Sequence, residues 1–239
     1  MGTDKLTDQL NLFIVSVKSG DQMSHSAPGR EGVVKYRLQF TPAQPPEWKG
    51  YPELNAWRRI LFRLRLIGQD RRLYGGLGYG NVSERVANGF VISATQTGGR
   101  EHLLPEDYAL VIEADPSANR IDAAGISHPS SEALTHAAVY RASSKVKVVL
   151  HGHCQEIWKM AGALDLPMTP REIDYGTPAM AEAVSEWVRR KPEGDVVVMG
   201  GHRDGVLAYG VSADQAGGLM VAVLARAWRL CERDPAGHL

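Results

Sequence analysis

The run from Lys145 to Cys154, KVKVVLHGHC, constrains the fold of this chain more than any other stretch. Its apolar part, Lys145 to Leu150, is predicted to be a β-strand, and His151 and His153 follow at the strand's end. Side chains at positions i and i+2 of a strand share one face. Both imidazoles can therefore point at one ion, and the run predicts a sheet with a pair of potential metal ligands at a strand end.

Strands and helices interleave along the rest of the chain, which indicates the α/β class. Strands are expected at 107–115, 195–199 and 206–209, and helices at 53–68, 130–142, 154–164, 177–191 and 212–233. Gly217 and Gly218 are weak points of the last helix. The arginines of the stretch RRILFRLR, residues 58–65, suggest an exposed helix face.

Residues 1–52 differ in character from residues 53–239, so we predict an N-terminal extension followed by one main domain. The extension contains two β-rich runs, at 12–17 and 33–40, and ends in the proline-rich segment TPAQPPEWKGYP, which reads as a linker. Two roles are open for the extension, namely covering a site or adding to an oligomer interface.

Composition excludes several classes of partner. Lys+Arg and Asp+Glu number 27 each, so no global positive field exists to hold nucleic acid or an anionic membrane. The chain has no apolar run of about 18 residues and no N-terminal signal pattern. Its two cysteines, Cys154 and Cys231, form no CxxC pair or disulfide framework, so the cytoplasm is the expected compartment.

A third potential ligand, His202, ends a second apolar strand in the run VVVMGGHRDG. Three imidazoles with an open fourth position are typical of catalytic zinc sites. An HxH pair also arises by chance or as a surface pair, so the histidines alone leave both interpretations open.

The segment SHPSSEALTH places Ser130, Ser131 and Glu132 where a helix is expected to begin. Free backbone amides and the positive end of the helix dipole favour a phosphate there. The same residues also fit a simple capping motif, and a cap and an anion site can use one geometry. Glu132 can reach the histidines as a fourth ligand or as a proton carrier. Asn81, Thr97 and Gly98 are polar loop groups suited to binding phosphate, since their glycine-rich surroundings lack a dinucleotide or Walker pattern.

The order of these motifs, GNVSER, ATQTGG, PSSE, a strand ending in HxH and a later strand-end histidine, resembles the class II aldolase/adducin family, and within it the fuculose-phosphate aldolases. The resemblance runs from about Glu53 to about Arg233. It implies a three-layer α/β/α fold with a central, mainly antiparallel sheet. It also implies a cytoplasmic homotetramer with active sites at subunit interfaces.

The resemblance further implies a metal-dependent lyase, an aldolase acting on a small phosphorylated ketose through a metal-stabilised enediolate. The metal would be Zn2+, with Mn2+, Fe2+ or Co2+ as alternatives. His151, His153 and His202 fall on the family's metal ligands, and Glu132 on the acid/base residue that also touches the metal. Asn81, Thr97, Gly98, Ser130 and Ser131 fall where the aldolases bind substrate phosphate.

Several positions depart from the family pattern. His202 is followed by Arg203-Asp204-Gly205, where the family often has glycine directly. The family's loop and C-terminal tyrosines have no evident match, although Tyr175 precedes a Gly-Thr pair. A sugar-phosphate dehydratase, epimerase or decarboxylase therefore stays open, although Glu132 argues against an epimerase. A non-catalytic adducin-like interaction module is a further alternative, from a different functional class.

Overall fold

One mixed sheet forms the centre of the protein. The structure is a computed structural model that describes residues 34–233. The eight strands run in the order β1-β7-β6-β5-β4-β8-β10-β9. Every neighbouring pair is antiparallel except β1 and β7 at one edge, which are parallel. The strands are β1 Arg37–Pro42, β4 Asn81–Val86, β5 Gly89–Ser93, β6 Tyr108–Asp115, β7 Arg120–Gly125, β8 Val148–His153, β9 Gly194–Val198 and β10 Gly205–Gly210.

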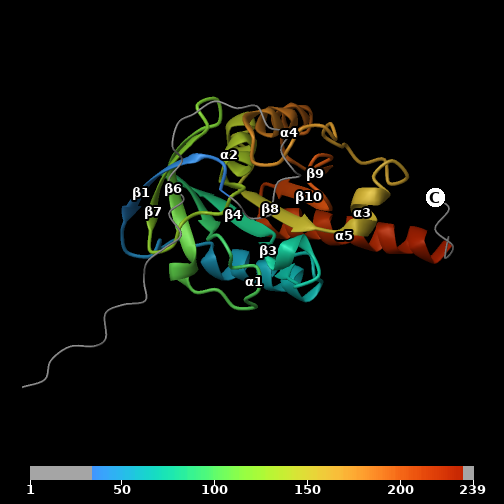
Figure 1. Cartoon of the computed structure of the whole chain (residues 1–239), viewed down its shortest axis with the longest axis horizontal. Coiled ribbons are helices and arrows are strands. Elements are labelled where there is room, and N and C mark those ends of the chain that lie inside the picture. The colour runs from blue at the N-terminus through green and yellow to red at the C-terminus, as the bar shows by residue number, and fades with distance from the viewer. Residues whose placement is uncertain (1–33, 234–239) are drawn as a thin grey trace, which may run out of the picture.

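Helices cover both faces of this sheet (Figure 1). The helices α2 and α4 lie on one face, and α1 and α5 on the other. The bounds are α1 Tyr51–Arg63, α2 Ala133–Ala142, α3 Gln155–Lys159, α4 Pro178–Arg190 and α5 Ala213–Arg233, with short 3-10 turns η1 Tyr74–Gly76 and η2 Pro105–Asp107 and a small hairpin of β2 Gly68–Gln69 and β3 Gly78–Tyr79. The predicted α/β/α architecture is confirmed. Among residues 34–233, no helix combines the length and apolar character needed to cross a membrane.

The alternation of side chains along β8 divides the core into two. Val148 and Leu150 pack in the cluster under α1 and α5, whereas Val149 packs in the cluster under α2 and α4. Because successive side chains point to opposite faces, His151 and His153 lie on the same face as Val149. Both histidines therefore point towards the layer that contains α2.

The structure corrects the extent of three predicted helices. The helix predicted at 53–68 ends at Arg63, the last residue of α1. α2 begins at Ala133 instead of Ser130, because Pro129 pairs with Ala94 in a β-bridge that holds the chain extended. α3 covers only 155–159 of the predicted 154–164, since Gly162 lies in the turn that follows it. Of the two β-rich runs in the extension, 33–40 overlaps β1 at residues 37–40, and 12–17 lies outside the described residues.

The expectation that the arginines of α1 face solvent is wrong for Arg58. This side chain is only 1% exposed, and its guanidinium donates to the carbonyl oxygens of Thr97 (2.8 Å) and Glu101 (2.9 Å). The loop 97–101 lies against α1 and presents carbonyl groups that need donors once they are buried. Arg58 thus fixes the loop that carries Thr97 and Gly98.

The two glycines of α5 predict opposite effects of the same substitution. A Cβ atom at Gly217 would overlap the indole of Trp57, which is held by a 2.7 Å hydrogen bond to Asp214, whereas a Cβ at Gly218 meets nothing within 4 Å. Alanine is favoured over glycine inside a helix by about 0.5–1 kcal/mol. We expect Gly218→Ala to raise the free energy of unfolding by about that amount. We expect Gly217→Ala to lower it by about 1–3 kcal/mol through overpacking. Urea unfolding of both variants tests this, and effects of equal sign would contradict the packing described.

Candidate metal centre

Three histidines meet at the end of strand β8. His151 and His153 come from β8, and His202 comes from the turn between β9 and β10. All three side chains are at most 3% exposed, and one nitrogen of each lies within 4.8 Å of the others. The Nε2 atoms of His151 and His153 are 3.2 Å apart. The grouping predicted from the sequence is therefore present in the structure.

The surroundings of His151 set its protonation. Its Nδ1 lies 3.2 Å from the carbonyl oxygen of Val206 on β10. A carbonyl only accepts hydrogen bonds, so Nδ1 carries the proton and Nε2 presents a lone pair towards His153. Burial, followed by the proximity of His202, holds the pKa of His151 well below its usual range. Burial and the same neighbour lower the pKa of His153 as well. Neutral imidazole is the form that binds a metal ion.

A tight turn brings His202 to the other two histidines. The backbone N–H of His202 donates to Met199, and its carbonyl accepts from Gly205 at 2.8 Å. A Cβ atom at position 205 would lie only 3.0 Å from the imidazole Cγ of His202. Glycine therefore lets the first residue of β10 pass directly beside the ring, which keeps His202 facing β8.

Glu132 completes the cluster from the side of α2. Its Oε1 lies 3.9 Å from Nδ1 of His202, and its Oε2 accepts a 2.9 Å hydrogen bond from Thr135. The glutamate side chain is 1% exposed. Three imidazoles and a buried carboxylate form a donor set that suits a divalent transition-metal ion. The residues present thus fit the metal that the sequence predicts.

A polar pocket adjoins the histidines. Asn81, the first residue of β4, pairs directly with His151 of β8, so the two side chains are neighbours on one face. The Oδ1 atom of Asn81 is buried without a hydrogen-bond partner. The other predicted phosphate residues line the same pocket, and they are Thr97, Gly98, Ser130 and Ser131. Gly78, Gly80 and Gln96 add to its wall. All five residues predicted for this role come together in the structure.

Sequence reasoning assigned no role to the tyrosines that contact the histidines, among them Tyr74 and Tyr175. The ring of Tyr74 lies 4.6 Å from that of His153, and its hydroxyl donates to Asp204 at 2.8 Å. The ring of Tyr175 stacks on His202 with centroids 4.5 Å apart. One signal was available, because Arg203 and Asp204 stand between His202 and Gly205, whereas the family often has glycine directly after the histidine. Tyr74 also has a left-handed backbone (φ 49°), which few residues other than glycine adopt.

His136 belongs to a buried network, as expected for a packed helix histidine. It is 0% exposed, and its Nδ1 lies 2.7 Å from the hydroxyl of Ser83, which also lies 2.7 Å from the Tyr140 hydroxyl. Burial lowers the pKa of His136 to about 3. The side chain is thus a neutral hydrogen-bonding group in the core under α2.

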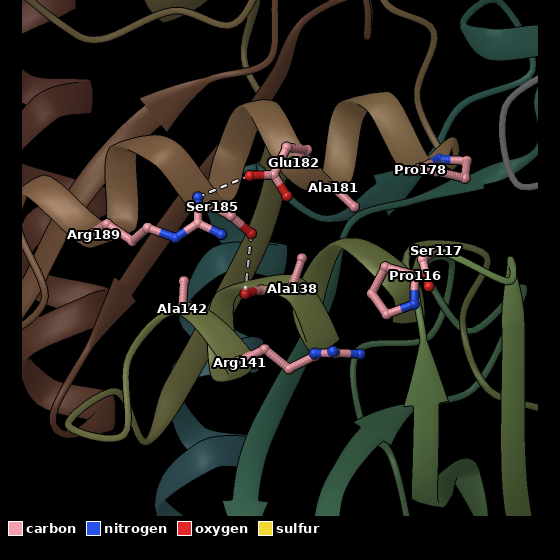
Figure 2. A pocket seen from close by; sticks show the side chains of 10 residues that line it. All are labelled: Pro116, Ser117, Ala138, Arg141, Ala142, Pro178, Ala181, Glu182, Ser185 and Arg189. Atoms are coloured by element: carbon pink, nitrogen blue, oxygen red, sulfur yellow. Dashed lines mark hydrogen bonds and ion pairs between the residues drawn. The ribbon is translucent and has the colours of Figure 1, made fainter.

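A separate groove of about 480 Å³ lies between α2 and α4 (Figure 2). Ser185 of α4 bonds the Ala138 carbonyl, and Arg189 pairs with Glu182 along one helix. Arg141 of α2 is a second arginine in its lining. None of the metal or phosphate candidates lines this groove, so it is distinct from the centre described above.

The buried state of His136 predicts a pH dependence of stability. Its pKa is about 3 in the folded protein and about 6.5 when unfolded, so between these values the unfolded chain binds a proton that the folded chain does not. The free energy of unfolding should therefore fall as the pH is lowered from 6.5 towards 3. In His136→Asn this fall should be shallower, whereas exposed His128→Ala should behave as wild type. Urea unfolding of metal-free protein across this range measures the difference, and parallel curves for all three proteins would refute the assignment.

Sequence comparison identifies a family domain in this chain. The class II aldolase and adducin N-terminal domain matches residues 68–228. Over 74 residues the chain is 43% identical to methylthioribulose-1-phosphate dehydratase from Gluconacetobacter diazotrophicus. That stretch is 31% of this chain and 34% of the relative, so the chain spans about a third of the relative's length in this match.

Solved structures share the fold. L-fuculose-1-phosphate aldolase from Thermus thermophilus is 21% identical with a TM-score of 0.60, and the match covers 79% of this chain and 97% of that one. YgbL from Klebsiella pneumoniae is 16% identical with a TM-score of 0.58, covering 79% and 90%. With more than half of its length matching the domain, the chain belongs to the class II aldolase/adducin family.

Proposed function

We propose that this protein is a metal-dependent lyase that cleaves a small phosphorylated ketose by an aldol reaction. The observation that carries the proposal is the buried carboxylate of Glu132, 3.9 Å from an imidazole of the three-histidine cluster, beside a polar pocket. A metal cluster, a proton carrier and an anion pocket are the three parts that such a reaction needs.

His151, His153 and His202 would hold the metal, with Glu132 within reach as a fourth ligand. We propose zinc, and manganese, iron and cobalt suit the same nitrogen donors. A bound divalent ion would act as a Lewis acid that polarises the substrate carbonyl and stabilises negative charge as the carbon–carbon bond breaks.

The polar pocket would anchor the substrate's phosphate. Ser130 and Ser131 offer hydroxyl groups next to the N-terminus of α2, where the helix dipole favours an anion. The buried guanidinium of Arg58 lies behind the loop of Thr97 and adds a positive charge. It donates hydrogen bonds to carbonyl groups of that loop. Since Asn81 lies beside His151, an anchored phosphate would present the adjoining carbons of the substrate to the histidines.

Glu132 would carry the proton. In aldol cleavage Glu132 would accept the proton of a substrate hydroxyl group as the carbon–carbon bond breaks, giving an aldehyde and a carbanion next to the ketone. Glu132 would then protonate that carbon, which yields dihydroxyacetone phosphate from a ketose 1-phosphate. The bond from Thr135 fixes Oε2 and leaves Oε1 on the side of His202.

Dehydration is the second candidate, and the 43% identical stretch shared with a dehydratase favours it. Here Glu132 would take a proton from the carbon next to the ketone while hydroxide leaves from the following carbon, so that water is lost. Both reactions pass through a carbanion at the same position, and they differ in which bond breaks.

We further propose a cytoplasmic homotetramer with active sites at subunit interfaces, in line with the family resemblance. Residues 1–52 would be an extension of the domain formed by 53–239, and β1 of this extension pairs with β7 of the central sheet.

Metal analysis tests the centre. Purified wild-type protein should hold close to one divalent ion per chain, and His151→Ala should lose it because two imidazoles alone bind weakly. His128→Ala is the matched control, since this histidine is exposed and lies outside the cluster. Wild-type protein that holds no stoichiometric metal after incubation with zinc, manganese, iron and cobalt salts would rule out the metal-dependent function.

Product analysis tests the reaction. Metal-loaded protein is incubated with a panel of ketose phosphates, and dihydroxyacetone phosphate, aldehyde and diketone are measured. Aldol cleavage releases the first two, whereas dehydration releases the third. Glu132→Gln should lower kcat by about 10²–10⁴-fold and retain the metal. Activity equal to wild type in Glu132→Gln would show that Glu132 does not carry the proton. The absence of product from every phosphorylated ketose would rule out this substrate class.

A further inference from the structure

His202 lies in a stack of rings that extends beyond the metal cluster. Its imidazole is 4.5 Å from the ring of Tyr175 with an interplanar angle of 22°, and 4.9 Å from the ring of His151 with an angle of 28°. Two rings cannot occupy the same face at these distances, so His202 is held between Tyr175 and His151. The Tyr175 side chain is 4% exposed, which makes it part of the buried wall.

Lys35 holds the outer side of Tyr175. Its Nζ lies 3.8 Å from the centroid of the phenol ring and donates to the carbonyl oxygen of Tyr175 at 3.0 Å. Since His202 covers one face of that ring, the ammonium must cover the other. The backbone of Lys35 is fixed in turn, because its carbonyl accepts a 2.8 Å hydrogen bond from the side chain of Asn119.

The next residue in the chain fixes the opposite wall of the site. Tyr36 is 6% exposed and donates from its hydroxyl to the carbonyl of Ser130 at 2.8 Å. Ser130 starts the turn that carries Glu132. Two consecutive residues of the N-terminal segment therefore contact both the Tyr175 loop and the Glu132 turn. Neither lies within the family match, which starts at residue 68.

We propose that Tyr175 is a positioning residue for His202, and that Lys35 holds Tyr175 in that place. This proposal rests on the proposed metal function of His202. A ligand whose ring plane is fixed before binding loses less rotational freedom when the metal arrives. Mutation of a group that orients a metal ligand typically lowers the metal affinity by about 10–100-fold. Ring stacking on His202 and a cation over the outer face of the phenol both favour this arrangement.

The role depends on the aromatic ring of Tyr175, so its variants should differ in a defined way. Tyr175→Phe keeps both faces and should bind metal within about 2-fold of wild type. Tyr175→Leu loses the stacking surface and should bind about 10-fold more weakly. Lys35→Met keeps the ring in the chain, removes the charge above it, and should weaken binding by about 3-fold, in keeping with one cation–aromatic contact. Lys35→Met should add nothing in the Tyr175→Leu background, because Lys35 acts on His202 through the Tyr175 ring.

The test titrates full-length protein with Co2+ and Zn2+ by calorimetry and follows the visible absorption of the cobalt form. The cobalt spectrum reports ligand geometry, which a general loss of stability would leave unchanged in the folded fraction. Urea unfolding with chelator present checks that each variant folds without metal. Lys145→Met is the matched control, since Lys145 is 57% exposed and pairs with Glu193 outside the site.

The outcomes separate the two proposals. Weaker binding and an altered cobalt spectrum in Tyr175→Leu, with Tyr175→Phe close to wild type, support the positioning role. Wild-type affinity and spectrum in Tyr175→Leu overturn it while leaving the metal function intact. If Lys35→Met and Lys145→Met change the metal affinity equally, Lys35 has no part in the positioning role. Wild-type protein that binds neither ion removes the metal function, and the positioning role with it.

Discussion

The antiparallel pairing of β8 with β4 on one side and β10 on the other is the constraint on which the site depends. It places Asn81 beside His151, and it brings the Val206 carbonyl of β10 to the Nδ1 of the same histidine. A shift of one residue in the register would turn His151 and His153 to the opposite face of the sheet. There they would meet the apolar cluster under α1 and α5, on the side away from Glu132 and the polar pocket.

The site as a whole is assembled from segments far apart in the chain, and each segment is anchored by its own bonds. Arg58 of α1 holds the loop of Thr97, Tyr36 holds the turn of Glu132, and Lys35 holds the loop of Tyr175. These three anchors lie N-terminal to the family match at residue 68. The N-terminal part of this protein thus supports a centre whose metal and phosphate candidates all come from the family domain.

Much of the fold and of the centre could be predicted because the signals are local. The apolar strand ending in His151 and His153 and the motif at Ser130 are read within ten residues, and motif order supplied the sheet architecture. The contacts of Tyr74, Tyr175 and Arg58 could not be predicted, since each depends on a partner more than 25 residues away in the chain. A sequence pattern carries no signal for an arginine whose partners are the carbonyl groups of a remote loop. The start of α2 was misplaced for the same reason, because the bridge between Pro129 and Ala94 is a long-range contact.

The adjacency of Asn81 and His151 has a consequence for substrate choice under the proposed function. The two groups sit on neighbouring strands, so their separation is set by the backbone hydrogen bonds between β4 and β8 and not by flexible side chains. The strand pairing would then fix the distance between the anchored anion and the reacting carbon. The number of atoms between phosphate and carbonyl would then be held constant. Changes of specificity within this scaffold would accordingly leave the strand pair unchanged.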